Sequence, residues 1–434
     1  MAEVRAFKGV RYSLSKVGRL DDVVSQPYDK ITDSMREDYY AKSEYNIVRI
    51  IKGKPEPGDS DTDNVYTRAR RYLDRWLDEK ILIQDSKPAL YIYHQEFEAP
   101  GLGSKTRKGF ICKQWIVPRF LGTVRPHERT LSKPKEDRLN LMRATATNFG
   151  QIFLLYPDEK NSVYQMLEPF AQGQPEMEAL EEGGVKHRVW TVHDGETIAR
   201  VTEAMKDKSL YIADGHHRFE TALDYLEERM MAAGASDTGE EPYNFRMVTL
   251  VGMEDPGLFI LPTHRLIHSL RDFSLDRFLE GCSNYFDLKP ASTVASALEA
   301  MKKAGEDHAL GLYAGGEYRV LTSKKGSGWE KMLPASRSAE WKGLDVVILH
   351  EVVIQELLGI SEEKVVTQKN IRYLRDPQAG IKAVDSGDAQ LLLLMNPTKV
   401  SQVKAVASKM EKMPQKSTDF FPKLISGLVM NPLT

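Results

Sequence analysis

The chain has 434 residues, of which 41% are apolar, so it can bury a sizeable core, and its length favours two or three domains. Lys and Arg total 60 against 62 Asp and Glu, so the surface offers no overall attraction to nucleic acid or to an anionic membrane. The two cysteines, Cys112 and Cys282, lie far apart and form neither a disulfide framework nor a thiolate zinc motif.

The first residues lack the apolar core of a signal peptide, and no apolar run is long enough to span a membrane. We therefore expect a cytoplasmic protein that binds neither nucleic acid nor membrane. Nothing in the composition argues for or against a homo-oligomer.

The first half of the chain mixes predicted helices and strands. Residues 46–51 are predicted to be extended, and apolar residues at three-to-four spacing predict a helix over 66–76. Strand-like runs at 89–97 and 109–117 flank a connector that contains Gly and Lys, which predicts a long hairpin. Ser132 and Pro134 are helix-start signals, and an apolar strand is predicted over 152–156.

The second half continues the alternation of helix and strand. Strands are predicted at 258–262, 309–313, 318–321 and 389–395, and helices at 298–303, 344–358 and 400–410. Residues 234–242 are rich in Gly, Ser, Asp and Glu, which marks a linker. The pattern predicts an α/β, mixed α+β chain with domains at 1–235 and 243–434.

The densest chemical motif is Asp214-Gly215-His216-His217-Arg218, between an apolar strand pattern and an amphipathic helix pattern. The amides and the dipole at a helix start favour an anion, and Gly215 allows the chain to bend closely around a ligand. Arg218 can grip phosphate oxygens, while Asp214 can hold magnesium or a hydroxyl proton. The alternative is a helix capped by Asp214 with exposed histidines, and we favour the phosphate-handling loop.

Residues 124–138 gather many cations around one glutamate, Glu128. Cationic neighbours would keep Glu128 ionised and able to act as a general base. Taken alone, this segment is more typical of a solvated charged loop. The charged residues concerned are Arg125, His127, Glu128, Arg129, Lys133, Lys135 and Arg138.

A third polar cluster lies near the C-terminal end, where Lys416, Ser417 and Thr418 could bind an anion or a substrate carboxylate. A turn that leads to core residues Phe420 and Phe421 explains the same segment equally well. Motifs for a Walker A loop, a protein-kinase catalytic loop and a dinucleotide-binding glycine loop do not occur in the sequence.

Several segments together resemble one known family. They are Pro27-Tyr28-Asp29, PHERT at 126–130, DRL at 137–139, IADGHHRFETA at 212–222, PTHR at 262–265 and MPQKSTDFFPKLISGL at 413–428. Across nearly its whole length the chain resembles the bacterial and archaeal family called domain of unknown function 1015. This set of segments is specific for the family and much less specific for a reaction.

The Asp-Gly-His-His-Arg turn is also similar to the nucleotide-binding turn of the ParB/sulfiredoxin-like superfamily, which includes free-serine kinases. The resemblance implies a ParB/sulfiredoxin-like nucleotide-binding core with extra N-terminal and C-terminal α+β regions. It implies that Glu128 is the catalytic base and that Asp214 is its partner. The stretch between these two residues is longer than the compact core needs, so 157–184 would be an insertion.

The resemblance also implies ligand-binding roles for the residues around these two carboxylates. Phosphate or nucleotide contacts are expected at Gly215, His216, His217, Arg218, Thr130 and Arg138. Substrate contacts are expected at His127, Lys416, Ser417 and Thr418.

The first functional hypothesis is a kinase that uses ATP or ADP with Mg²⁺ to phosphorylate a small hydroxyl metabolite, free L-serine above all, giving O-phosphoserine. The second is a non-catalytic nucleotide-binding switch. The third, a metal-dependent hydrolase that uses His216, His217 and Asp214, lacks a further cluster of ligands at metal spacing.

Overall fold

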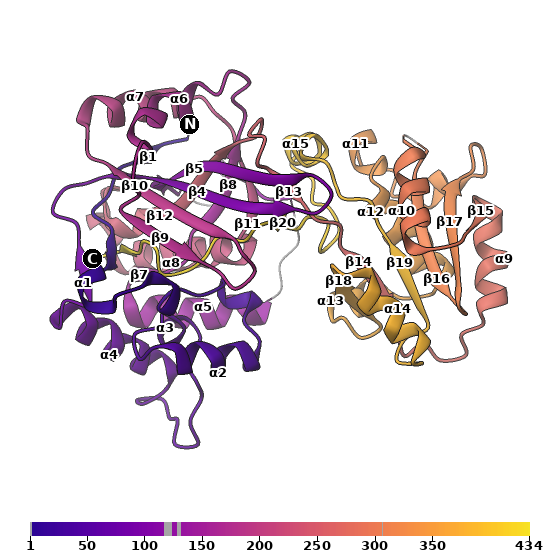
Figure 1. Ribbon diagram of the computed structural model, residues 1–434, viewed down its shortest axis with the longest axis horizontal. Coiled ribbons are helices and arrows are strands. Elements are labelled where there is room, and N and C mark those ends of the chain that lie inside the picture. Colours follow the sequence, from indigo (N-terminus) through magenta and orange to yellow (C-terminus); the bar gives the residue numbers. More distant parts are fainter. Residues whose placement is uncertain (1, 117–123, 128–131, 306) are drawn as a thin grey trace. The chain divides into compact units, whose positions relative to one another are not determined.

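The computed structural model describes residues 2–116, 124–127, 132–305 and 307–434. Contacts divide the chain into two compact units (Figure 1). Unit 1 comprises Met1–Arg125, Leu131–Phe259 and Pro422–Thr434, and unit 2 comprises Pro126–Thr130 and Ile260–Phe421. The last segment of the chain therefore belongs to the first unit.

Unit 1 is built on a mixed sheet with the strand order β6-β11-β8-β12-β5-β4-β10-β9, and β1 pairs with β5. Every residue of β8 and of β12 is buried, as expected for strands that are covered on both faces. The strands are β1 (Val4–Arg5), β4 (Leu90–Ala99), β5 (Gly103–Trp115), β6 (Val124–Arg125), β8 (Ile152–Tyr156), β9 (Met177–Leu180), β10 (Lys186–Val192), β11 (Leu210–Asp214) and β12 (Phe245–Gly252).

Helices cover both faces of this sheet (Figure 1). Helices α6 (Ser162–Leu167) and α7 (Gly195–Met205) pack on one face in an apolar core shared with β4, β5, β8 and β12. On the other face, α5 (Ser132–Thr145) and α8 (His216–Ala233) form a second core with Tyr243 and Leu433. This layering places the start of α8 at the end of β11, inside unit 1.

Smaller elements complete unit 1. Its other helices are α1 (Leu14–Val17), α2 (Asp33–Lys42), α3 (Val48–Ile51) and α4 (Val65–Asp78). Short strand pairs join β2 (Val10–Tyr12) to β3 (Leu82–Gln84) and β21 (Asn431–Pro432) to β7 (Thr147–Asn148).

The boundary between the two units does not lie at the predicted linker, residues 234–242. Unit 1 continues to Phe259, and unit 2 resumes at Ile260. Residues 234–242 connect α8 to β12, and β12 lies between β8 and β5 in the sheet of unit 1. A domain that ended at residue 235 would lack β12, although all eight residues of this strand are buried in the structure. A polar linker composition here marks a surface loop inside a unit.

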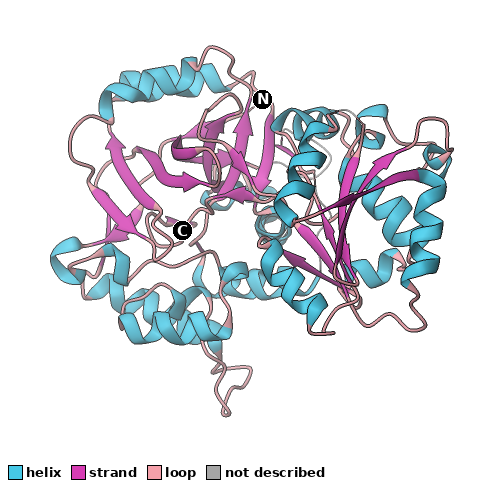
Figure 2. Cartoon of the chain, turned by 45° about the vertical axis from the view of Figure 1, so that its right-hand side comes forward, coloured by secondary structure: helices cyan, strands magenta, loops and turns pink. Residues whose placement is uncertain are grey.

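Unit 2 has a sheet with the strand order β15-β17-β16-β19-β14-β18 and helices beside it (Figure 2). An apolar core joins α10 and α14 to β16 and β19. The strands are β13 (Phe259–Ile260), β14 (His264–Ile267), β15 (Phe286–Ala291), β16 (Ala309–Ala314), β17 (Glu317–Ser323), β18 (Ile371–Leu374), β19 (Leu391–Leu394) and β20 (Phe420–Phe421). The helices are α9 (Leu275–Tyr285), α10 (Val294–Lys303), α11 (Ala339–Lys342), α12 (Asp345–Ile348), the π-helix η8 (Leu349–Leu357), α13 (Glu362–Val366), α14 (Pro377–Asp385) and α15 (Val400–Ser408).

The mixed α/β class that the sequence predicts is confirmed. The longer predicted helices and the predicted hairpin are confirmed as well. The predicted helices at 66–76, 344–358 and 400–410 correspond to α4, α12 with η8, and α15, and the predicted hairpin is β4 and β5. Among the described residues, no helix has the length and apolar character needed to cross a membrane.

Two local predictions are wrong. Residues 46–51, expected to be extended, contain the helix α3. The side chain of Asn46 accepts a hydrogen bond from the Val48 amide (3.0 Å) and donates one to the Asp22 carbonyl (2.8 Å), so tertiary contacts start this helix. The strand expected at 258–262 is reduced to the two residues of β13.

Candidate functional site

The Asp-Gly-His-His-Arg motif forms the predicted turn from β11 to α8 in unit 1. The pairing of β11 with β8 shifts register between Ile212 and Asp214, a bulge of the kind that redirects a side chain near an active site. Gly215 has φ of 93°, and a Cβ there would lie 3.0 Å from Nε of Arg218. Only glycine fits both constraints, because other residues disfavour this φ and would press on the guanidinium.

Asp214 lies at the centre of a buried ion cluster with Arg218 and Lys423, which we call the Asp214 cluster. Lys423 Nζ is 2.6 Å from Oδ1 of Asp214, and an Arg218 terminal nitrogen is 2.5 Å from Oδ2. Burial by itself would raise the pKa of Asp214, but the charges of Lys423 and Arg218 outweigh it and hold that pKa well below its ordinary value. Asp214 is therefore ionised at neutral pH.

Buried polar contacts hold Lys423 in position. The Gln95 side-chain amide donates to the Lys423 carbonyl (2.8 Å), and Arg107 donates to the preceding carbonyl, that of Pro422 (2.5 Å). Arg107 also donates from Nε to Oε1 of Gln95 (3.1 Å), and its guanidinium lies 4.5 Å from the centre of the Phe153 ring. Strands β4 and β5 thereby anchor the returning C-terminal segment.

A second carboxylate of unit 1, the half-buried Asp255, also has a shifted pKa. Burial raises its pKa from 3.8 to about 6, although its carboxylate accepts the Gly257 amide (2.9 Å). The folded state thus binds this proton more tightly than the unfolded state, and the contribution of Asp255 to stability falls as pH rises from about 4 to about 6.

We expect Asp255→Asn to be more stable than the wild type by about 2 kcal/mol at pH 8, with the difference shrinking towards pH 4. Asparagine keeps an acceptor for the Gly257 amide but carries no charge. The measurement is denaturant unfolding of both proteins from pH 4 to pH 8. A difference that is independent of pH would contradict the assignment.

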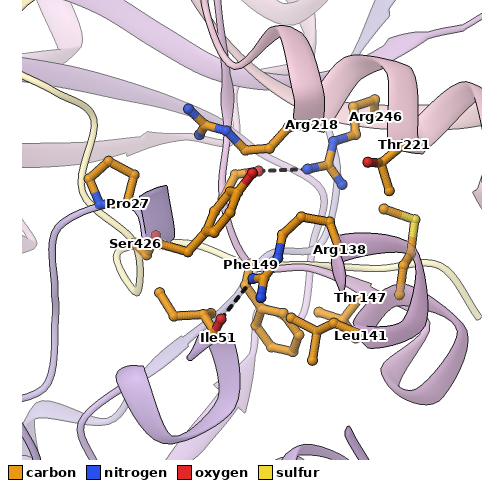
Figure 3. Close-up of a pocket in the computed structure, with 13 residues that line it drawn as sticks. Pro27, Ile51, Arg138, Leu141, Thr147, Phe149, Arg218, Thr221, Arg246 and Ser426 are labelled. Carbon is orange, nitrogen blue, oxygen red and sulfur yellow. Dashed lines mark hydrogen bonds between the residues drawn. The ribbon is translucent and has the colours of Figure 1, made fainter. Parts of the chain in front are cut away.

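A second feature of unit 1 is a cavity of about 480 Å³, including open solvent at its mouth, which we call the arginine pocket (Figure 3). Arg138 enters it from α5, Arg218 from α8 and Arg246 from β12. Its lining consists of Pro27, Tyr28, Ile51, Arg138, Leu141, Met142, Thr147, Phe149, Gly150, Arg218, Thr221, Arg246 and Ser426.

The arginine pocket brings together two residues that were predicted to bind a nucleotide, Arg138 and Arg218. Arg138 donates to the Ile51 carbonyl (2.7 Å), and its guanidinium lies 4.1 Å from the centre of the Tyr28 ring. Burial raises the pKa of Tyr28 to about 12, so this phenol stays protonated at neutral pH. The predicted Pro-Tyr-Asp segment thus contributes a pocket wall.

The cationic segment at 124–138 does not form one basic surface. Arg125 lies 5.6 Å from the centre of the Tyr211 ring, and Lys135 pairs with Glu220 (3.1 Å), on α8. Glu128, Thr130 and Arg129 lie outside the described residues. The predicted base and one predicted phosphate contact therefore stay predictions.

The four residues predicted to bind substrate all belong to unit 2. His127 Nε2 lies 2.9 Å from Oγ1 of Thr418, so the structure brings these two side chains together. The Ser417 hydroxyl donates to the Pro414 carbonyl (2.6 Å) and closes a turn, while Lys416 is exposed with φ of 56°. Ser417 has a structural contact, and the substrate roles stay predictions.

The described residues offer the predicted magnesium ion no ready cluster of ligands, and Asp214 as its ligand stays a prediction. No group of three or more His, Cys, Asp or Glu side chains with metal-binding geometry occurs among them. Lys423, Arg218 and Lys30 lower the pKa of Asp214 through their charges, and the same charges repel a divalent cation. His216 is buried and His217 half-buried, at the first turn of α8.

Lys423 and Arg246 belong to the candidate site but were not predicted from the sequence. A local signal existed for each, because Lys423 follows Phe420-Phe421-Pro422 and Arg246 interrupts the apolar run of β12. Charged residues are seldom fully buried unless they are paired, so a charge in an apolar run indicates either a partner or a ligand.

The chain matches one protein family by sequence and is distantly similar to several solved structures. The family described as "Protein of unknown function (DUF1015)" matches residues 4–347. No curated protein matches the chain.

Three solved structures with distant similarity illustrate the likenesses. A conserved hypothetical protein from Pyrococcus furiosus is 11% identical with a TM-score of 0.33, and the match covers 70% of this chain and 89% of that one. Free serine kinase in complex with AMP is 11% identical with a TM-score of 0.33, covering 69% and 83%. SbnI with C-terminal truncation from Staphylococcus aureus is 12% identical with a TM-score of 0.34, covering 73% and 86%.

Proposed function

This chain belongs to the DUF1015 family, and we propose that it is a nucleotide-dependent phosphotransferase. Its acceptor is a small hydroxyl metabolite, free L-serine above all, and its product is then O-phosphoserine. The observation that carries the proposal is the Asp214 cluster, which holds Lys423 and Arg218 at the start of α8. Two cations beside a helix N-terminus favour the phosphates of ATP or ADP.

Phosphoryl transfer needs mainly positioning and charge neutralisation. Lys423 is only 7% exposed, and the Asp214 carboxylate opposite it is its counter-ion. Asp214 acts here as a positioning residue, because both of its oxygens accept hydrogen bonds from the cations. No step in this proposal depends on magnesium held by the protein.

In the proposed reaction the substrate hydroxyl oxygen attacks the terminal phosphorus of the nucleotide. A new O–P bond forms, the bond from phosphorus to the bridging oxygen breaks, and the shortened nucleotide leaves with that electron pair. Glu128 is the proposed base that takes the hydroxyl proton. This role comes from the sequence resemblance.

The test is an assay with ATP or ADP, Mg²⁺ and L-serine that follows phosphoserine. We expect Glu128→Gln to bind the nucleotide with wild-type affinity and to lose about 10²- to 10⁴-fold in kcat, the usual contribution of a general base. Glu196→Gln, an exposed change on α7, is the matched control and should keep full activity.

Two results would contradict this proposal. Nucleotide binding by the wild type without transfer to L-serine or to any other small hydroxyl compound would leave a nucleotide-binding switch as the function. Full activity of Glu128→Gln would remove Glu128 from the mechanism.

A further inference from the structure

Arg246 is a buried cation without a counter-ion among the described residues. It lies on β12, in the middle of the unit 1 sheet, and only 4% of it is exposed. One terminal nitrogen donates to the Gly150 carbonyl (3.0 Å), while Nε and the other terminal nitrogen have no hydrogen-bond partner in the described part of the chain. A buried guanidinium that leaves two nitrogens unsatisfied is costly for the fold.

The other two arginines of the arginine pocket are paired. Arg218 is bonded to Asp214, and Arg138 to Asp137 (2.8 Å). None of the described residues that line the pocket is acidic. Asp214 is shared between Arg218 and Lys423, so it offsets the charge of Arg218 only in part, and the charge of Arg246 has no counter-ion among the described residues. An anion bound in the pocket would offset this positive charge.

The remaining walls are largely apolar. Leu141 and Met142 come from α5, and Phe149 and Ile51 lie at the same cavity. Hydroxyl groups are supplied by Thr221 and Ser426. A buried cation that faces apolar walls matches an anion with an apolar body, which an aliphatic carboxylate has and inorganic phosphate lacks.

We infer that the arginine pocket binds a small aliphatic monocarboxylate, with the carboxylate on Arg246 and the carbon chain against Leu141, Met142 and Phe149. Asp214 and Lys423 do not line this pocket. Arg218 is common to the pocket and the Asp214 cluster, but the carboxylate is placed on Arg246, which the proposed phosphoryl transfer does not use. The inference therefore goes beyond the proposed phosphotransferase.

Calorimetric titration and thermal unfolding of the full chain test it, at constant ionic strength. The probes are acetate, butyrate and hexanoate, with butyramide as the uncharged control and inorganic phosphate as the competing anion. We expect butyrate and hexanoate to bind and to raise Tm, and butyramide to have no effect. Affinity should increase from acetate to hexanoate as more apolar surface is buried.

Arg246→Met should weaken hexanoate binding at least tenfold and raise Tm without ligand, because an uncompensated charge is removed. A second variant leaves Arg246 in place. A Cβ added at Gly150 would lie 3.5 Å from an Arg218 terminal nitrogen and 3.8 Å from Oγ of Ser426, so Gly150→Ala fits and narrows the pocket. We expect it to weaken hexanoate at least fivefold. Arg200→Met, an exposed change on α7, is the control.

The inference fails if no monocarboxylate binds the wild type, or if inorganic phosphate binds and carboxylates do not. It fails equally if Gly150→Ala and Arg246→Met both bind hexanoate as the wild type does. These readouts are binding measurements, so a negative kinase assay leaves their outcome unaffected.

Discussion

Asp214→Asn is expected to lower the free energy of unfolding by about 3–5 kcal/mol, the usual effect of removing one partner from a buried ion pair. In the wild type, Asp214 is the shared counter-ion of Lys423 and Arg218, whose side chains are 7% and 8% exposed. Asparagine keeps the shape but leaves two buried cations side by side. Chemical denaturation at neutral pH measures the change.

A double-mutant cycle separates this electrostatic effect from packing. Lys423→Met removes one of the stranded cations, so Asp214→Asn combined with Lys423→Met should cost less than the sum of the two single changes. Asp137→Asn is the matched control, because Asp137 also pairs with an arginine but is 43% exposed, and it should cost under about 1 kcal/mol. If Asp214→Asn lowers the free energy of unfolding by less than about 1 kcal/mol, the Asp214 cluster does not stabilise the fold as proposed.

Lys423→Met is expected to reduce kcat by about 10²- to 10³-fold if Lys423 neutralises charge on the transferred phosphoryl group, as the proposed function requires. Methionine fills a similar volume without the charge. The assay is nucleotide-dependent phosphorylation, with kcat and the nucleotide KM determined separately, at a temperature where thermal unfolding shows the variant folded.

Lys208→Met is the matched control for this prediction. Lys208 also pairs with an aspartate of unit 1, Asp158 (3.3 Å), and is 19% exposed. It should leave kcat within about threefold, as expected for a change away from the reacting groups. Turnover of folded Lys423→Met within the same limit would exclude Lys423 from the chemistry. Lys423→Arg keeps the charge in a different geometry and should recover part of the activity.

Much of the local structure could be predicted from the sequence. The apolar run before Asp214, the glycine after it and the helical spacing that follows predict a strand, a turn and a helix, and β11 and α8 have that arrangement. The hairpin of β4 and β5 and the helices α4 and α5 follow from patterns of the same kind. These patterns succeed because side-chain periodicity depends on residues only a few positions apart.

The helix α3 could not be predicted from local sequence patterns. Its segment is rich in β-branched residues, which favour strands, yet Asn46 ties it to the carbonyls of Asp22 and Val24. The composition of the segment does not reveal either hydrogen bond, because the acceptors lie more than twenty positions earlier in the chain.

By itself, then, the sequence determined the fold class, the family resemblance and the strand, turn and helix around residues 214–218. Only the tertiary structure decided that residues 422–434 return to unit 1 and place Lys423 on Asp214, 209 positions away. It also decided that Arg138, Arg218 and Arg246 meet in one pocket. The reason is that such contacts depend on the order and register of strands that pair far apart in the chain, which no local spacing of residues encodes.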